Sequence, residues 1–139
     1  MDIKIIHNLF LKCKSISIDT RKIEATSFFV AIKGENYDAN TFAKEALEKG
    51  ASFVIIDNPH YFIDERTIVV QDSLETLQEL ARFHRSYLNI PIIALTGSNG
   101  KTTTKELIQV ILSKKYKTKA TLGNLNNHIG VPLTLLSFD

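Results

Sequence analysis

Cysteine is scarce in this sequence, which excludes a disulfide framework. The 139 residues include a single cysteine, Cys13, and it has no metal-ligand spacing around it. The four histidines are too far apart in the sequence to predict a local zinc site. We therefore expect a cytoplasmic protein in a reducing compartment, with Cys13 as a buried or half-buried thiol.

Strong charge of one sign and long apolar runs are also missing. Seventeen basic residues against fifteen acidic residues give a net charge of +2 at pH 7, too small a bias to predict nucleic-acid binding. No apolar run approaches the ~20 residues that span a bilayer. Lysines and a histidine interrupt the N-terminal "IKIIHNLFLK", and no small-residue cleavage site follows it. These absences predict no nucleic-acid partner, no membrane association and no signal peptide.

What the first 88 residues do contain is an alternation of short helical and strand patterns. Apolar residues recur at helical spacing in 1–12, 38–50 and 73–88, and β-rich runs occupy 15–19, 27–32, 52–56 and 67–70. The order is helix, strand, strand, helix, strand, strand, helix, with a polar turn between the first two strands and a glycine stop at Gly50. This order predicts an α/β fold. The residues expected on the inner helix faces are Ile5, Ile6, Leu9, Phe10, Phe42, Ala43, Ala46, Leu47, Leu74, Leu77, Leu80 and Ala81.

A second pattern begins after residues 88–91, where we expect a domain boundary. Residues 91–96, "PIIALT", form a continuous apolar run of the kind buried on both faces of a parallel sheet. A helix is expected over 103–116, a strand over 117–122, and then a polar loop that leads into an apolar run. The helix is expected to turn Leu107, Ile108, Ile111 and Leu112 inward.

The glycine loop between the apolar run and the next helix has the features of a phosphate-binding loop. Its backbone N–H groups and the helix N-terminus would offer donors and a positive dipole end to an anion. Gly97 and Gly100 permit close approach, Lys101 would reach the β/γ-phosphates, and Thr102 would offer a hydroxyl to Mg²⁺. The loop is shorter than G-x-x-x-x-G-K-[ST], whose first glycine would fall at Leu95. The alternative is a tight turn capped by threonines before an exposed lysine.

Three segments resemble the ATP-dependent Mur ligase family. Residues 96–106, "TGSNGKTTTKE", resemble the shortened glycine loop of these ligases and of their relative folylpolyglutamate synthetase. Residues 18–51, "IDTRKIEATSFFVAIKGENYDANTFAKEALEKGA", resemble the N-terminal domain that holds the UDP end of a muramoyl-peptide. Residues 123–136, "GNLNNHIGVPLTLL", are similar to the branch that adds D-Ala-D-Ala, although His128 stands where acidic or small residues are more usual.

The resemblance implies an α/β fold with a small N-terminal Mur-ligase substrate domain, residues 1–88, followed by the first β-loop-α-β unit of a P-loop parallel-sheet ATPase domain, residues 89–139. It also implies amide-bond formation with ATP and Mg²⁺ as cofactors. ATP would phosphorylate the terminal carboxylate of UDP-N-acetylmuramoyl-tripeptide, and the amine of D-Ala-D-Ala would attack the acyl phosphate. ADP and phosphate would leave, and the product would serve peptidoglycan synthesis.

The resemblance further assigns individual residues to these ligands. The ATP site would comprise Gly97, Ser98, Asn99, Gly100, Lys101, Thr102 and Thr103. Lys101 and Thr102 would be catalytic, because Lys101 would neutralise the γ-phosphate and Thr102 would ligate Mg²⁺.

The substrate would be bound by Thr20, Arg21, Lys33, Gly34, Glu35, Asn36, Asn126 and Asn127. A hydroxyl and a guanidinium suit uracil and diphosphate oxygens. The simpler alternatives are that Thr20 and the two asparagines form turns and that Arg21 is a surface charge.

Three functional classes stay open at this point. The first is the D-Ala-D-Ala-adding ligase, the second is the ligase that adds the third residue, and the third is a non-catalytic UDP-sugar-binding module with a vestigial loop. The second usually has a Thr-Thr-Pro segment where this chain has "NLNNHIGVP". Because the family's ligases have three domains, we expect these 139 residues alone to be inactive and to self-associate through sheet edges exposed after "TLLSF".

Overall fold

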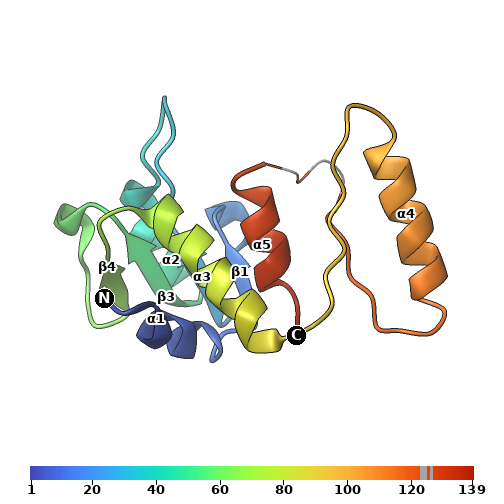
Figure 1. Cartoon of the computed structure of the whole chain (residues 1–139). Coiled ribbons are helices and arrows are strands. Elements are labelled where there is room, and N and C mark those ends of the chain that lie inside the picture. Colours follow the sequence, from blue (N-terminus) through green and yellow to red (C-terminus); the bar gives the residue numbers. More distant parts are fainter. Residues whose placement is uncertain (123–124, 126) are drawn as a thin grey trace.

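The protein, described by a computed structural model for residues 1–122, 125 and 127–139, has an α/β fold built on a four-stranded parallel sheet (Figure 1). The strands follow one another in the order β1-β2-β3-β4, and every neighbouring pair is parallel. They are β1 (Ser15–Ser17), β2 (Ser27–Val30), β3 (Ala51–Ile56) and β4 (Thr67–Val69). The helices of this part are α1 (Ile3–Phe10), α2 (Ala43–Glu48) and α3 (Ser73–Leu88), with single 3₁₀ turns at η1 (Thr20–Lys22), η2 (Ala39–Phe42) and η3 (Pro59–Tyr61). The predicted class and element order are confirmed.

Strand β2 organises the core because all four of its residues are buried. Adjacent strand residues point to opposite faces, so Phe28 packs with α1 and α3 on one face and Phe29 packs with α2 on the other. Neighbouring β3 divides in the same way, with Ile55 on the first side and Val54 on the second. The sheet is therefore covered by helices on both faces, as parallel sheets require.

The predicted helix limits hold where capping residues define them. Helix α3 covers the predicted residues 73–88, and the Asp72 carboxylate accepts the backbone N–H of Glu75 at 2.8 Å. After α2, Gly50 adopts φ +108°, which confirms the glycine stop. Two expected inward residues are wrong, since Ile5 is 52% exposed and Phe42 is 40% exposed.

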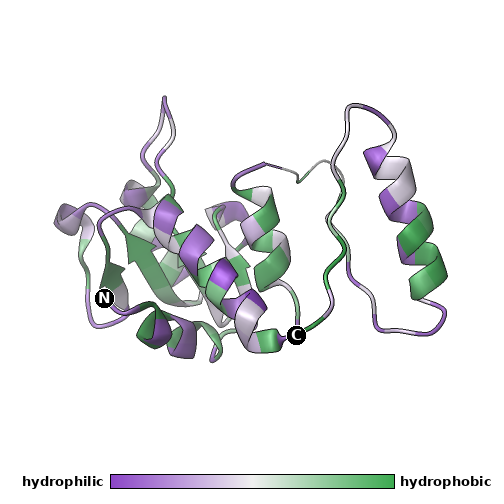
Figure 2. Cartoon of the chain, viewed as in Figure 1, coloured by the Kyte–Doolittle hydropathy of each residue, from purple (hydrophilic) through white to green (hydrophobic). Residues whose placement is uncertain are grey.

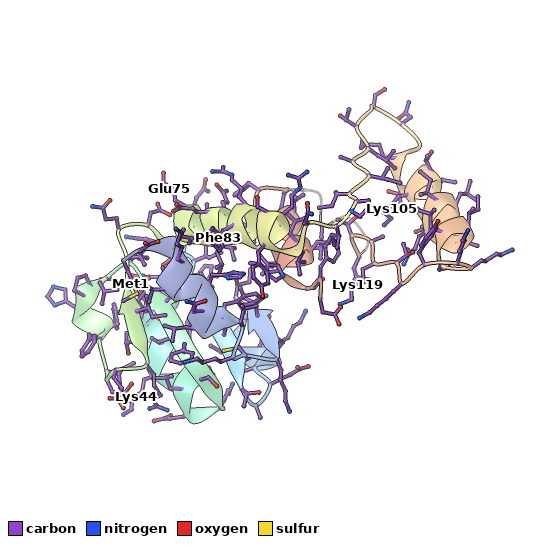
Figure 3. The ribbon with its side chains drawn as sticks, turned by 60° about the horizontal axis from the view of Figure 1, so that its bottom comes forward. Met1, Lys44, Glu75, Phe83, Lys105 and Lys119 are labelled. Atoms are coloured by element: carbon purple, nitrogen blue, oxygen red, sulfur yellow. The ribbon has the colours of Figure 1, made fainter. Side chains whose placement is uncertain are left out.

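The two strands predicted beyond residue 90 are wrong. Residues 91–96 and 117–122 form no strand, because a strand needs ladder hydrogen bonds to a neighbour and neither segment joins a sheet in the described part of the chain. Lysine contacts hold the second segment: Lys105 Nζ donates to the Thr121 carbonyl at 2.6 Å, and Lys119 pairs with Asp139 at 2.6 Å. Figure 3 shows Lys105 and Lys119 together at this end of the molecule, away from Lys44 of α2.

Helix α4 (Lys101–Leu112) confirms the predicted helix but not its inward face. It stands apart from the other helices in Figure 1, and none of its residues is buried. Leu107 is 60% exposed and Ile111 is 66% exposed, and in Figure 2 the green, apolar C-terminal part of α4 stands away from the other helices. Among the helices that the structure describes, none is both long and apolar enough to cross a membrane.

Helix α5 (Gly130–Leu136) replaces the sheet edge that was expected after "TLLSF". It packs on α3, and its Leu136 joins the core around Phe28. The expected reason for self-association at this segment is therefore wrong. The exposed apolar residues of the C-terminal half lie mainly on α4 and the segments around it.

Two buried histidines tie the chain ends to α3. His7 Nε2 lies 3.0 Å from His84 Nδ1, and His84 Nε2 lies 3.0 Å from the Phe138 carbonyl. The carbonyl can only accept, so His84 Nε2–H is the donor in that bond. Between the two rings, one nitrogen must donate and the other must accept, so this contact is lost when both rings carry two protons. Sequence spacing gave no sign of it, because the two histidines are 77 residues apart.

We predict that acid weakens the fold through this pair. Burial and the neighbouring His84 lower the pKa of His7 below its ordinary 6.5, so the unfolded chain binds more protons than the folded one between the two values. The contribution of His7 to the free energy of unfolding is therefore fully present above pH 6.5 and is lost as the pH falls below that value toward the lowered pKa of the folded state. Denaturant unfolding at several pH values between about 7 and 5 measures this, above the range near pH 4 where carboxylates titrate.

The matched variant is His7→Phe, which keeps an aromatic ring beside Phe83 and Tyr87. We expect it to reduce the slope of unfolding free energy against pH in this window. An unchanged slope would show that the acid sensitivity has another source.

Candidate functional site

The glycine loop has the backbone of a phosphate-binding turn. Gly97 has φ +147° and Gly100 has φ +77°, and α4 begins directly after Gly100. A residue with a Cβ would be strained at the Gly100 conformation. No side chain caps α4, so its first N–H groups and its positive dipole end face outward. An anion is the natural partner of such a helix end.

All seven predicted ATP residues lie in this one stretch. Six of them, Gly97 to Gly100 with Thr102 and Thr103, are exposed, and Lys101 is half-buried. The Lys101 ammonium donates to the Gly97 carbonyl across the loop. This contact keeps the charge over the loop, where a phosphate oxygen could replace the carbonyl.

The predicted substrate loop projects from the carboxyl end of β2. Residues 33–37 are all exposed, and the light-blue hairpin they form rises above the sheet in Figure 1. Its base is closed by an antiparallel bridge between Lys33 and Asp38. Within it, the Gly34 N–H donates to the Tyr37 carbonyl at 2.9 Å. Ligands bind beyond the carboxyl ends of strands in open α/β sheets.

Thr20 and Arg21 lie on η1, beside α2. The Thr20 carbonyl accepts from Lys49, the residue at the end of α2, at 3.1 Å, and Lys49 also pairs with Glu45 at 2.6 Å. The substrate loop leads directly into the start of η2 and α2, whereas the contact of Thr20 is with the end of α2.

The Arg21 guanidinium already has an anionic partner. It pairs with Asp19 at 2.8 Å while its side chain is 86% exposed. Hydrogen bonds from the Arg21 side chain and backbone lower the pKa of Asp19 to about 2. The pair holds the guanidinium in place, and its outer N–H groups face solvent, where a diphosphate could reach them.

Of the two predicted asparagines, Asn126 lies outside the described residues. The Asn127 side-chain oxygen accepts from the N–H groups of Ile129 at 3.1 Å and Gly130 at 2.7 Å, so it forms a turn. The following His128 is exposed, and its carbonyl accepts from Gln78 of α3 at 3.1 Å.

An open groove of about 430 Å³ runs between α3 and the start of α5. Its polar lining comes from Gln78, Arg82, Asn127 and His128. The sequence did not predict that Gln78 and Arg82 line a groove, because polar residues four apart on a helix are also typical of a face that is simply exposed to solvent.

Metal-ligating side chains do not gather in the part of the chain that is described: it holds no group of three His, Cys, Asp or Glu residues arranged for a metal ion. Cys13 is half-buried, and burial raises the pKa of its thiol to about 11. A thiol of such high pKa is a weak nucleophile at neutral pH.

A glycine loop that opens a helix, beside an α/β domain, is the arrangement of P-loop proteins. Sequence comparison gives the family: residues 12–85 match the Mur ligase family, catalytic domain, and residues 95–139 match the Mur ligase middle domain. The chain belongs to the Mur ligase family.

Individual relatives are more specific. The chain is 42% identical over 124 residues to a UDP-N-acetylmuramoyl-tripeptide--D-alanyl-D-alanine ligase of Bacillus subtilis, and 43% identical over 122 residues to that of Escherichia coli. Each match covers 88% of this chain and 27% of the relative. The chain therefore spans about a quarter of the length of these relatives.

Solved structures of Mur ligases match the fold of this chain. MurF from Acinetobacter baumannii matches with a TM-score of 0.82 and 34% identity, over 99% of this chain and 33% of that one. A MurF ligase from Thermotoga maritima, solved in complex with ADP, matches with a TM-score of 0.79 and 33% identity, over 91% of this chain and 29% of that one.

Proposed function

We propose that this chain is the substrate-binding and loop-bearing part of a cytoplasmic ligase that joins D-Ala-D-Ala to UDP-N-acetylmuramoyl-tripeptide. The observation that carries the proposal is the continuous similarity, through both loops, to relatives that bear this name. The proposed division is a UDP-muramoyl-peptide domain over residues 1–88 and the start of an ATP-binding domain over residues 89–139.

The glycine loop would hold ATP. Its residues fit a nucleotide phosphate, because an uncapped helix start follows two glycines with positive φ. Lys101 would leave the Gly97 carbonyl for the γ-phosphate, and the exposed Thr102 hydroxyl would be one ligand of Mg²⁺. When bound, ATP and Mg²⁺ supply the activation that turns a carboxylate into an acyl donor.

The N-terminal residues would hold the other end of the substrate. Arg21, fixed by Asp19, would meet the diphosphate with its outward N–H groups. The exposed loop from Lys33 to Asn36 would contact the nucleotide, and Asn127 would shape the turn that faces the sugar-peptide part.

Calorimetric titration of this chain with UDP-N-acetylmuramoyl-tripeptide, and then with UDP alone, tests the proposal. We expect saturable binding to both, and binding at least about tenfold weaker in Arg21→Ala, because a charge-assisted contact contributes about 1.5–3 kcal/mol. The control is Arg66→Ala, which removes a similar exposed pair with Asp64 on the β4 side of the sheet. Folded protein that binds neither ligand would contradict the proposal.

A further inference from the structure

One fully buried polar side chain, Asn40, lies under the substrate loop without belonging to it. It is 0% exposed, at the second residue of η2, and is flanked by the core residues Ala39 and Ala43. Burying an amide costs free energy unless all its hydrogen-bonding groups find partners. Asn40 meets that condition.

The partners of Asn40 come from two different strand ends. Its Nδ2 donates to Asp38 Oδ1 at 2.6 Å and to Asp57 Oδ1 at 2.7 Å, while its Oδ1 accepts from the N–H groups of Asp57 at 3.0 Å and Asn58 at 3.4 Å. Carboxylates on one side and backbone donors on the other fix the orientation of the amide. An aspartate or a leucine would not fit, because neither donates to two carboxylates.

These bonds join the base of the substrate loop to the rest of the sheet. Asp38 closes the loop through its bridge to Lys33, and Asp57 follows β3 directly. Asp57 Oδ2 also accepts the N–H of Ser73 at 3.4 Å, at the start of α3. The segments after β2 and β3 and before α3 are thereby held as one unit.

Within the described residues, no other side-chain hydrogen bond joins this loop to a distant segment. Its residues 33–37 are exposed, so apolar packing does not fix where they stand. We propose that Asn40 is a positioning residue: it fixes the substrate loop, residues 33–36, relative to the carboxyl end of the sheet, so that the loop can contact the UDP end of the substrate. This inference rests on the proposed function.

The test uses Asn40→Asp, which keeps the size of the side chain and places a third carboxylate against Asp38 and Asp57. Two readouts are taken on folded protein. One is hydrogen exchange at the Gly34 amide, inside the loop, against the Ala31 amide, which bonds the Ile55 carbonyl at 2.9 Å. The other is the calorimetric affinity for UDP-N-acetylmuramoyl-tripeptide.

We expect exchange at Gly34 to be at least about tenfold faster in the variant, with Ala31 unchanged, and the affinity to fall about tenfold or more. Asn40→Ala adds no charge and carries the same expectation if Asn40→Asp does not fold. Leu80→Ala is the control, because Leu80 is fully buried in the separate cluster around α1 and α3. It lowers global stability, so exchange at the Ala31 amide is expected to rise, while exchange at Gly34 and the affinity are expected to stay unchanged.

Equal loss of affinity in Leu80→Ala would mean that general stability is responsible, and unchanged affinity in a variant with an open loop would mean that the loop position does not matter. Either result overturns the proposal. If the unaltered chain bound no UDP ligand, the proposed function would fail, while the exchange data would still report whether Asn40 holds the loop.

Discussion

Replacing Phe28 with alanine is expected to lower the free energy of unfolding by about 3–5 kcal/mol. Phe28 is 0% exposed on β2, a strand with neighbours on both edges, and its ring meets the Phe10 ring edge-on with centroids 6.1 Å apart. The truncation removes buried area and leaves a cavity between α1, α3 and the sheet. Against a total stability of about 5–15 kcal/mol for a domain, this is a large part of the whole.

Urea or guanidinium unfolding, followed by far-UV circular dichroism, measures the change. Phe62→Ala is the control, because Phe62 is 55% exposed and is expected to change stability by less than about 0.5 kcal/mol. A loss below about 1 kcal/mol in Phe28→Ala would show that the two-sided core around β2 is described wrongly.

The largest effect on activity is expected from Lys101→Ala. The measurement needs a complete ligase, so we suggest a chimera in which this chain replaces the corresponding part of the Bacillus subtilis relative, 42% identical over 124 residues. Removing the lysine takes a positive charge from the place where phosphate charge develops, and kcat should fall by about 10²–10³-fold. Lys114→Ala, on an exposed residue just beyond α4, should leave kcat unchanged.

Phosphate release coupled to consumption of D-Ala-D-Ala measures kcat in the chimera. Turnover by Lys101→Ala at the parent rate would remove the lysine from the proposed mechanism, and the contact that it makes with the Gly97 carbonyl would then be a structural loop closure only.

The sequence predicted the first 88 residues well because local signals and packing agree there. Asp72 caps the start of α3, and Gly50 ends the α2 region. The apolar runs predicted as strands pair with one another in a parallel sheet. Beyond residue 90 the local signals were similar, yet residues 91–96 and 117–122 form no strand. A strand is defined by its partner, and a pattern within one segment does not contain that partner.

The candidate site shows the same division. The glycine spacing predicted the loop before α4, and its positive φ angles and uncapped helix start fit that prediction. The roles of its residues stay predictions. Asn40 and the His7–His84 pair were not predicted, because each acts through partners from distant segments. The sequence alone does not distinguish an asparagine that is buried from one that forms a turn at the surface.

Formation of UDP-N-acetylmuramoyl-pentapeptide by the chimera is the most direct test of the proposed ligase function. Purified chimera is incubated with UDP-N-acetylmuramoyl-tripeptide, D-Ala-D-Ala, ATP and Mg²⁺, with one component omitted in each control, and the product is identified by mass spectrometry. We expect product only in the complete mixture, with one phosphate released per product. A folded chimera that binds the UDP substrate and ATP but forms no product would contradict the proposal that this chain is part of such a ligase.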